Sequence, residues 1–170
     1  MLFDTHAHMD DRAFDADREA LLSALPEQGI GLLMNPGCSL ASSRAASALA
    51  DRYDYIYAAV GIHPETAGQQ PADYLAQLEQ LAKHPKVVAI GEIGLDYHYE
   101  GYDRESQSVL LREQLDLAKQ LDLPVIIHAR DCTEDYLRIL QEFRPRGVVH
   151  CFSGSAETAR EVLKLGMYIG

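Results

Sequence analysis

The chain has 170 residues, 47% of them hydrophobic and 24% charged, which is ordinary for a globular protein able to bury a sizeable core. Its net charge of -11 argues against a protein that holds nucleic acid through a broad basic face. This charge does not exclude an enzyme that meets a phosphate group locally, because bound divalent ions can supply positive charge.

The sequence gives two indications of compartment. No stretch approaches the roughly 18 apolar residues of a membrane span, and the N-terminus shows no basic and apolar leader pattern. The three cysteines, Cys38, Cys132 and Cys151, are widely spaced and match neither a disulfide framework nor a Cys-x-x-Cys metal site. We therefore expect a cytoplasmic protein with no membrane partner.

Short apolar runs alternate with helical patterns along the whole chain. The runs predicted as strands begin at Leu2-Phe3 and continue at 30–34, 55–60, 87–90, 124–127, 147–149 and 167–169. The helices predicted between them cover about 15–28, 39–52, 71–83, 103–121, 133–143 and 155–165. This alternation implies parallel strands joined by right-handed crossovers, and we expect one α/β domain over residues 1–170.

Four local features of this pattern can be compared directly with a structure. The first strand is expected to be buried, and Pro71 is placed well for the first turn of its helix. Asp131 or Thr133 is expected to cap the helix that follows the fifth strand. Cys151 should point away from its neighbour on the sixth strand and act as a small, buried core residue.

Histidines and one glutamate follow these predicted strands with unusual regularity. They are His6 and His8 after the first strand, His63 after the third, Glu92 after the fourth, His128 after the fifth and His150 after the sixth. In a parallel sheet or barrel the carboxyl ends of all strands face one rim, where barrel enzymes build their sites. The sequence therefore predicts that these six side chains converge.

The residue types in this group favour a metal site. His6 and His8 are two apart, so on an extended chain both imidazoles point the same way and can bind one ion. His128 and His150 can bind a second ion, and Glu92 has two oxygens with which to bridge the pair. Two ions about 3.5–4 Å apart can activate water and hold both oxygens of a displacement at phosphorus.

Each residue also has a purely structural interpretation. His6 and His8 could be surface histidines, and His63 could be a turn residue before Pro64. His128 and His150 could be core histidines with satisfied hydrogen bonds. A lone carboxylate at Glu92 would be costly to bury on an apolar strand, which makes a cation partner the more natural explanation there.

Five segments of the chain, in this order, resemble the signatures of the TatD family of metal-dependent deoxyribonucleases. They are Asp4-Thr5-His6-Ala7-His8, Val60-Gly61-Ile62-His63-Pro64, Gly91-Glu92-Ile93-Gly94-Leu95-Asp96-Tyr97, His128-Ala129-Arg130-Asp131 and His150-Cys151-Phe152-Ser153-Gly154. The resemblance implies a (β/α)8 TIM barrel of the amidohydrolase superfamily that trims single-stranded DNA from the 3′ end. It also implies two divalent metal ions, which could be Mg²⁺, Zn²⁺ or Mn²⁺.

The resemblance assigns roles to individual residues. It implies metal ligation by five residues, namely His6, His8, Glu92, His128 and His150. It implies that His63 contacts the scissile phosphate, and we expect Glu92 and His63 to be the catalytic residues. Arg130, beside a ligand, is expected to bind substrate, with a surface salt bridge as the alternative.

Members of this family resemble chains of about 250 residues, the usual size of the barrel, whereas this sequence ends at Gly170. The chain is thus expected to cover about six βα units and the start of strand seven. The resemblance implies an eighth-strand aspartate, in a Thr-Asp-Ser-Pro context, that no residue here provides. We therefore expect a fragment or a partner of a second chain, nearly inactive alone and able to associate through its open barrel edges.

The ligand set leaves the reaction open among three possibilities. The leading one is a phosphodiesterase acting on DNA ends. The second is a deacylase or amidohydrolase, with D-aminoacyl-tRNA as one candidate substrate. The third is an inactive, incomplete barrel that binds metal or a partner without turnover.

Overall fold

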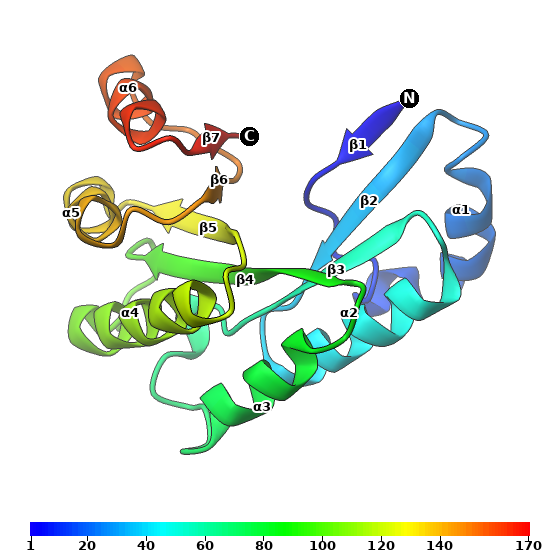
Figure 1. The fold of residues 1–170 in the computed structure, drawn as a ribbon, viewed down its shortest axis with the longest axis horizontal. Coiled ribbons are helices and arrows are strands. Elements are labelled where there is room, and N and C mark those ends of the chain that lie inside the picture. The colour runs from blue at the N-terminus through cyan, green and yellow to red at the C-terminus, as the bar shows by residue number, and fades with distance from the viewer.

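The computed structural model describes residues 1–170 and shows one sheet of seven parallel strands in sequence order. The strands are β1 (Leu2–Asp4), β2 (Ile30–Pro36), β3 (Ile56–Val60), β4 (Val87–Asp96), β5 (Val125–Arg130), β6 (Gly147–Val149) and β7 (Tyr168–Ile169). Figure 1 shows that the sheet curls around a hollow side. This arrangement confirms the expected α/β fold, with the chain covering part of a barrel.

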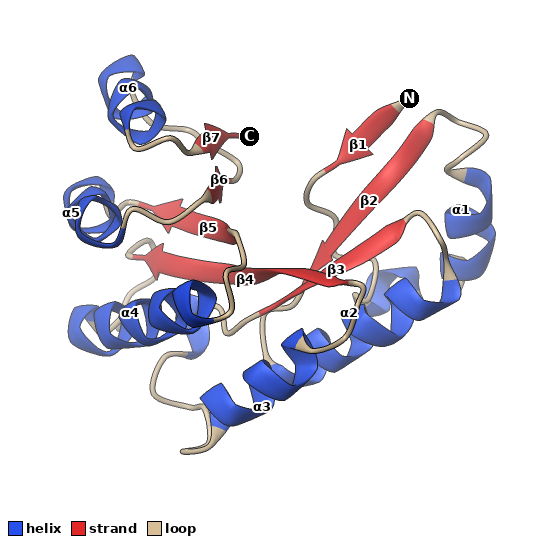
Figure 2. Ribbon diagram, viewed as in Figure 1, coloured by secondary structure: helices blue, strands red, loops and turns tan.

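A layer of helices covers the outer side of the curled sheet (Figure 2). They are α1 (Arg18–Ala24), α2 (Leu40–Arg52), α3 (Tyr74–Ala82), α4 (Arg104–Gln120), α5 (Thr133–Phe143) and α6 (Ala156–Lys164), with short 3₁₀ helices η1 (Arg12–Phe14) and η2 (Pro64–Thr66). None of these helices combines the length and the apolar character that crossing a bilayer would require.

The two faces of the sheet bury different residues. Ala58, Val60, Val125 and Ile127 belong to the main core, which they share with residues of the helices. Ala59 and Ile126 alternate with them and belong to a smaller apolar cluster that also contains Met34 and Ala89. Because successive side chains of a strand point to opposite faces, the smaller cluster lies on the hollow side.

The sheet ends at β1 and β7, which pair with β2 and β6 only. The expectation of a buried first strand is wrong, since Leu2 is 67% exposed and Phe3 50% exposed. Tyr168 on the other edge strand is 74% exposed. An edge strand has a neighbour on one side only, so its apolar side chains lack part of the cover that inner strands have.

Strand β4 contains an irregularity that matters for the site. Its Ile90 pairs with Val125 and its Ile93 with Ile127, so three steps along β4 match two steps along β5. Ile90 and Ile93 both belong to the main core. Strict alternation from Ile90 would aim Glu92 toward the helices, and the extra residue turns it toward the hollow side instead.

Two helices are shorter than the sequence pattern predicts. Helix α1 covers only Arg18–Ala24, and its end coincides with Pro26, which has no backbone N–H to donate to the Leu22 carbonyl. Helix α3 begins at Tyr74, so Pro71 is not in its first turn. Pro71 instead precedes the helix, and its carbonyl accepts a hydrogen bond from the Tyr74 backbone N–H at 3.1 Å.

Two further local expectations are wrong. Neither Asp131 nor Thr133 caps α5: the position belongs to Cys132, whose side chain makes no capping hydrogen bond. Asp131 has a positive φ of 54° and pairs with His98. Cys151 is exposed, because the chain has left β6 and turns there with φ of 45°.

Candidate metal centre

Five imidazole rings surround the carboxylate of Glu92, which is 3% exposed. Glu92 Oε2 lies 3.2 Å from His6 Nε2 and 3.3 Å from His8 Nε2. Glu92 Oε1 lies 3.0 Å from His128 Nδ1 and also contacts His150 Nε2. His63 Nε2 lies further away, 3.8 Å from Oε1. The structure thus brings six side chains together from five separate parts of the chain, with one close pair of histidines on each carboxylate oxygen.

The backbone elements position these groups in slightly different ways from those the sequence indicates. Glu92 and His128 lie within β4 and β5, because both strands extend beyond their predicted ends. His6 and His8 follow β1, and His150 lies in the turn after β6. The His6 and His150 rings stack at 3.8 Å between centroids, with an angle of 4° between their planes.

A backbone carbonyl fixes the ring of His8. Its Nδ1 lies 3.1 Å from the Pro36 carbonyl oxygen, which can only accept, so this nitrogen carries the proton. In the neutral ring, Nε2 therefore has a free lone pair. This lone pair points at Glu92 Oε2 and at His6 Nε2, which is 3.0 Å away.

A buried aspartate fixes the ring of His128. His128 Nε2 donates to Asp96 Oδ2 at 2.9 Å, which leaves the Nδ1 lone pair of a neutral ring facing Glu92 Oε1. Asp96 is 3% exposed, and Gln107 on α4 brackets its backbone by accepting from its N–H and donating to its carbonyl, both at 2.8 Å.

Sequence reasoning missed this role of Asp96. The available signal was its position in the Gly-Leu-Asp-Tyr segment, four residues beyond Glu92. The pairing of Asp96 with the His128 ring is visible only once β4 and β5 lie side by side.

Lone pairs that face a carboxylate require a positive charge between them. At each Glu92 oxygen, a nitrogen lone pair and an oxygen lone pair lie about one hydrogen-bond length apart. Either a proton or a metal ion can supply the charge, and neutral imidazole with carboxylate suits divalent transition metals. Two ligand groups are compact enough to share an ion, namely His6-His8-Glu92 and His63-Glu92-His128. The donor set therefore fits divalent cations.

Burial and contacts shift the pKa values of these groups in opposite directions. Burial alone would raise the pKa of Glu92, but four imidazoles, each able to donate to it when protonated, hold it well below its usual range. Burial lowers the pKa of His6. Burial also acts to lower the pKa of His128, but hydrogen bonds to Glu92 and Asp96 raise it.

His63 occupies a distinct position beside this cluster. It is the N-cap of η2, and its Nδ1 accepts a hydrogen bond from the Glu65 backbone N–H at 3.3 Å. Burial lowers the pKa of His63 to about 4, so the ring is neutral near pH 7. Its proton is then on Nε2, which lies 3.8 Å from Glu92 Oε1 and is free to donate to a ligand.

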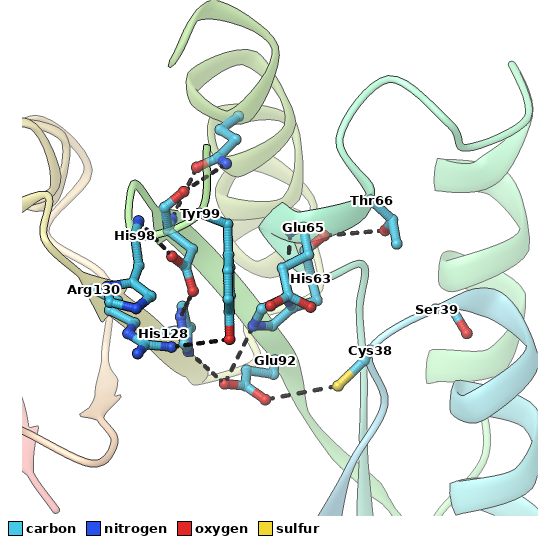
Figure 3. A network of polar contacts seen from close by, with 12 residues as sticks. Cys38, Ser39, His63, Glu65, Thr66, Glu92, His98, Tyr99, His128 and Arg130 are labelled. Atoms are coloured by element: carbon cyan, nitrogen blue, oxygen red, sulfur yellow. Dashed lines mark hydrogen bonds and ion pairs between the residues drawn. The ribbon is translucent and has the colours of Figure 1, made fainter. Parts of the chain in front are cut away.

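Arg130 and Tyr99 form a pair at the mouth of the site (Figure 3). The Arg130 guanidinium lies 5.3 Å from the Tyr99 ring centroid, and its Nη1 donates to Tyr99 Oη at 3.3 Å. No carboxylate lies within 4.0 Å of Arg130, so the alternative of a surface salt bridge is wrong. Sequence reasoning did not find Tyr99.

A glycine allows β4 and β5 to come together at this point. Gly94 pairs with His128 and has φ of 158°. A Cβ atom at Gly94 would lie 1.9 Å from the His128 carbonyl oxygen. Any side chain there would push away the strand that carries His128.

Comparison with known proteins connects this geometry to a family. The family model described as TatD related DNase matches residues 3–170, nearly the whole chain. The chain belongs to the TatD-related DNase family. Among relatives, it is 41% identical to an uncharacterised metal-dependent hydrolase, YabD, of Bacillus subtilis, with 99% of this chain and 68% of that protein aligned. It is 37% identical to the 3′-5′ ssDNA/RNA exonuclease TatD of Cronobacter turicensis, covering 99% of this chain and 65% of that protein.

Solved structures of TatD-family proteins share this fold. The crystal structure of YjjV, a TatD homologue from Escherichia coli K12, superposes with a TM-score of 0.93 at 40% identity, covering 99% of this chain and 67% of that one. A TatD-family hydrolase from Entamoeba histolytica gives a TM-score of 0.90 at 26% identity, covering 99% and 64%. The chain spans about two thirds of the length of these relatives.

Proposed function

We propose that this TatD-family chain carries the metal centre of a phosphodiesterase that removes nucleotides from the 3′ end of single-stranded DNA or RNA. One observation carries the proposal. The two oxygens of the buried Glu92 each face a separate pair of imidazole nitrogens. A relative that is 37% identical bears the name of a 3′-5′ ssDNA/RNA exonuclease, which supports this choice of substrate.

The proposal has two ion positions. His6, His8 and Glu92 Oε2 would hold one divalent ion, and His128, His150 and Glu92 Oε1 the other. Divalent ions at such a centre lower the pKa of bound water and neutralise charge on the phosphate. Pro36 and Asp96 keep the rings of His8 and His128 in the orientation that ligation needs.

His63 is the proposed donor to the substrate. Its Nε2–H points into the site because Nδ1 is occupied by the Glu65 backbone N–H. A neutral ring that donates one hydrogen bond can hold a non-bridging phosphoryl oxygen and stabilise the charge that grows on it during hydrolysis. His63 would thereby orient the phosphate through one donated hydrogen bond while the ring stays neutral.

Arg130 supplies the nearby permanent positive charge. Its guanidinium makes no ion pair and lies at the mouth of the site, where it can meet a backbone phosphate of the substrate. In a chain with net charge -11, such local cations must do the work that a broad basic surface does in other nucleic-acid-binding proteins.

The test uses the chain with 5′-labelled single-stranded DNA and RNA in Mg²⁺, Mn²⁺ or Zn²⁺. We expect shortening from the 3′ end that stops with chelator and with Glu92→Gln. Parallel assays with D-aminoacyl-tRNA and cyclic amides address the deacylase and amidohydrolase alternatives. Faster turnover of either, or bound metal with no turnover of any substrate, would contradict the proposal.

A further inference from the structure

A cavity of about 440 Å³ lies beside the metal centre, and none of the proposed metal ligands lines it. It lies between η2 and the loop that joins β4 to α4, and its lining includes Glu65, Asp96 and Tyr99. Two of these residues connect it to the site: Asp96 Oδ2 contacts His128, and Glu65 Oε2 lies 3.7 Å from His63 Nδ1. Its size is that of a small-molecule site.

Tyr99 lines this cavity with an aromatic ring. The ring is 54% exposed, although it lies next to a buried polar centre. Figure 3 shows it extending from its loop toward Glu92, with Arg130 on one side and Glu65 on the other. Arg130 lies over one face of the ring, and His98 makes an edge-to-face contact with it at 5.1 Å between centroids. These two contacts fix the orientation of the Tyr99 ring. On the side that faces the cavity no aromatic ring or cation stacks on Tyr99, so a flat group can stack there.

The charge of the cavity indicates what kind of group enters. Carboxylates from four residues line it, and no lysine or arginine does; they are Glu65, Asp96, Glu100 and Asp103. A second phosphate would be repelled here, whereas a neutral heterocycle with amino donors would not. Asp103 and Gln107, at the beginning of α4, also line the cavity.

We propose that this cavity binds the 3′-terminal nucleobase, with Tyr99 as the stacking surface that positions the adjoining phosphate at the metal centre. The inference rests on the proposed function, since it takes the substrate to be a nucleic-acid end. Stacking on an aromatic ring is tolerant of base identity, because every base has a π-face. The site would then recognise that a base is present more strongly than which base it is.

The test measures binding separately from cleavage. Oligonucleotides with a 5′ fluorophore end in either adenosine or an abasic nucleotide, and their dissociation constants are measured by fluorescence anisotropy in Ca²⁺. The chain should bind the adenosine-ended strand about 5- to 150-fold more tightly, the range that stacking of one base supplies. Tyr99→Ala should reduce this preference to about two-fold or less, whereas Tyr99→Phe should keep the preference.

A matched control variant is Tyr53→Ala, which removes another tyrosine that lies under an arginine, Arg52, away from the cavity. It should keep the preference. The inference is overturned if the unsubstituted chain shows no preference, if it binds neither strand, or if Tyr99→Ala keeps the preference. Binding with the expected preference but no cleavage in Mg²⁺ or Mn²⁺ would instead count against the proposed function alone.

Discussion

The rim at the carboxyl ends of the strands and the layer between sheet and helices bury opposite kinds of side chain. In the helix-covered layer, fully buried side chains such as Ile93, Leu111 and Ile139 are apolar, and their contacts stabilise the fold directly. At the rim, a buried carboxylate and five imidazoles point at one another. Burial of such polar groups is costly unless each is paired.

The difference shows which region carries stability and which carries function. The layer needs only apolar residues of suitable volume, and many sequences can meet that requirement. The rim needs particular atoms in particular orientations, such as the His8 and His128 rings held by Pro36 and Asp96. Substitutions in the layer should therefore change the free energy of unfolding, whereas substitutions at the rim should change ligand binding.

The largest effect should come from Glu92→Gln, because the amide removes the carboxylate charge that would hold cations at the proposed metal centre. We expect hydrolysis to fall by about 10³-fold or more, as ions supply several kcal/mol of charge stabilisation. Metal binding by titration calorimetry should weaken at both positions, while the circular dichroism spectrum stays that of the unsubstituted chain. Glu142→Gln removes a surface carboxylate paired with Arg112 and is the control. Full metal affinity in Glu92→Gln would contradict the assignment.

In the other region, Leu111→Ala should lower the free energy of unfolding by about 2–5 kcal/mol, because it leaves a cavity under α4. Urea denaturation measures this change. Val109→Ala on the same helix is the matched control, since Val109 is 49% exposed, and its effect should be small. Metal affinity under native conditions should not change in either variant. A loss of affinity in Leu111→Ala would show that the two regions are coupled.

A third prediction concerns the support of the metal ligands. Asp96→Asn keeps the shape of the side chain but removes the charge that orients His128. We expect metal affinity to fall by about 10- to 100-fold, the usual cost of losing such a partner. Asp131→Asn is the control, because Asp131 makes a comparable but exposed pair with His98. Equal affinities in the two variants would contradict a special role for Asp96.

A fourth prediction tests the apolar layer through pH. Burial raises the pKa of Cys132 to about 12, so the folded chain keeps this thiol proton while the unfolded chain loses it near pH 8.5. Above that pH the unfolded state binds fewer protons, and stability must fall as pH rises toward 12. The slope from this group approaches about 1.4 kcal/mol per pH unit. Urea denaturation at pH 9–11 should show a shallower slope for Cys132→Ala, whereas the exposed Cys151→Ala should not differ from the unsubstituted chain.

The smallest expected effect is that of Ser39→Ala at the start of α2. Ser39 and Ser42 exchange hydrogen bonds with each other's backbone N–H, at 3.1 Å and 2.9 Å. Loss of this cap should cost about 1 kcal/mol of unfolding free energy. Ser23→Ala within α1 is the control and should be nearly neutral. An equally small change in both variants would mean that α2 depends on its packing alone.

Much of the fold can be predicted from local patterns of the sequence. The alternation of apolar runs with helical periodicity is sufficient to predict the parallel sheet, since each element needs only its own residues to be recognised. Helix ends were less predictable: Pro26 shortened α1, and the Asp131–His98 pair left α5 without its expected cap. These ends depend on competing interactions that nearby sequence does not reveal.

The sequence by itself determined which residue types gather at the rim, because strand exits in a parallel sheet share one side. Only the tertiary structure decided how those groups meet. The extra residue in β4 between Ile90 and Ile93 turns Glu92 to the hollow side, where alternation alone would have pointed it at the helices. Asp96 and Tyr99 acquire their partners in the same way, from β5, which lies more than thirty residues further along the chain. Orientation is a property of neighbouring strands in contact, and no single strand encodes it.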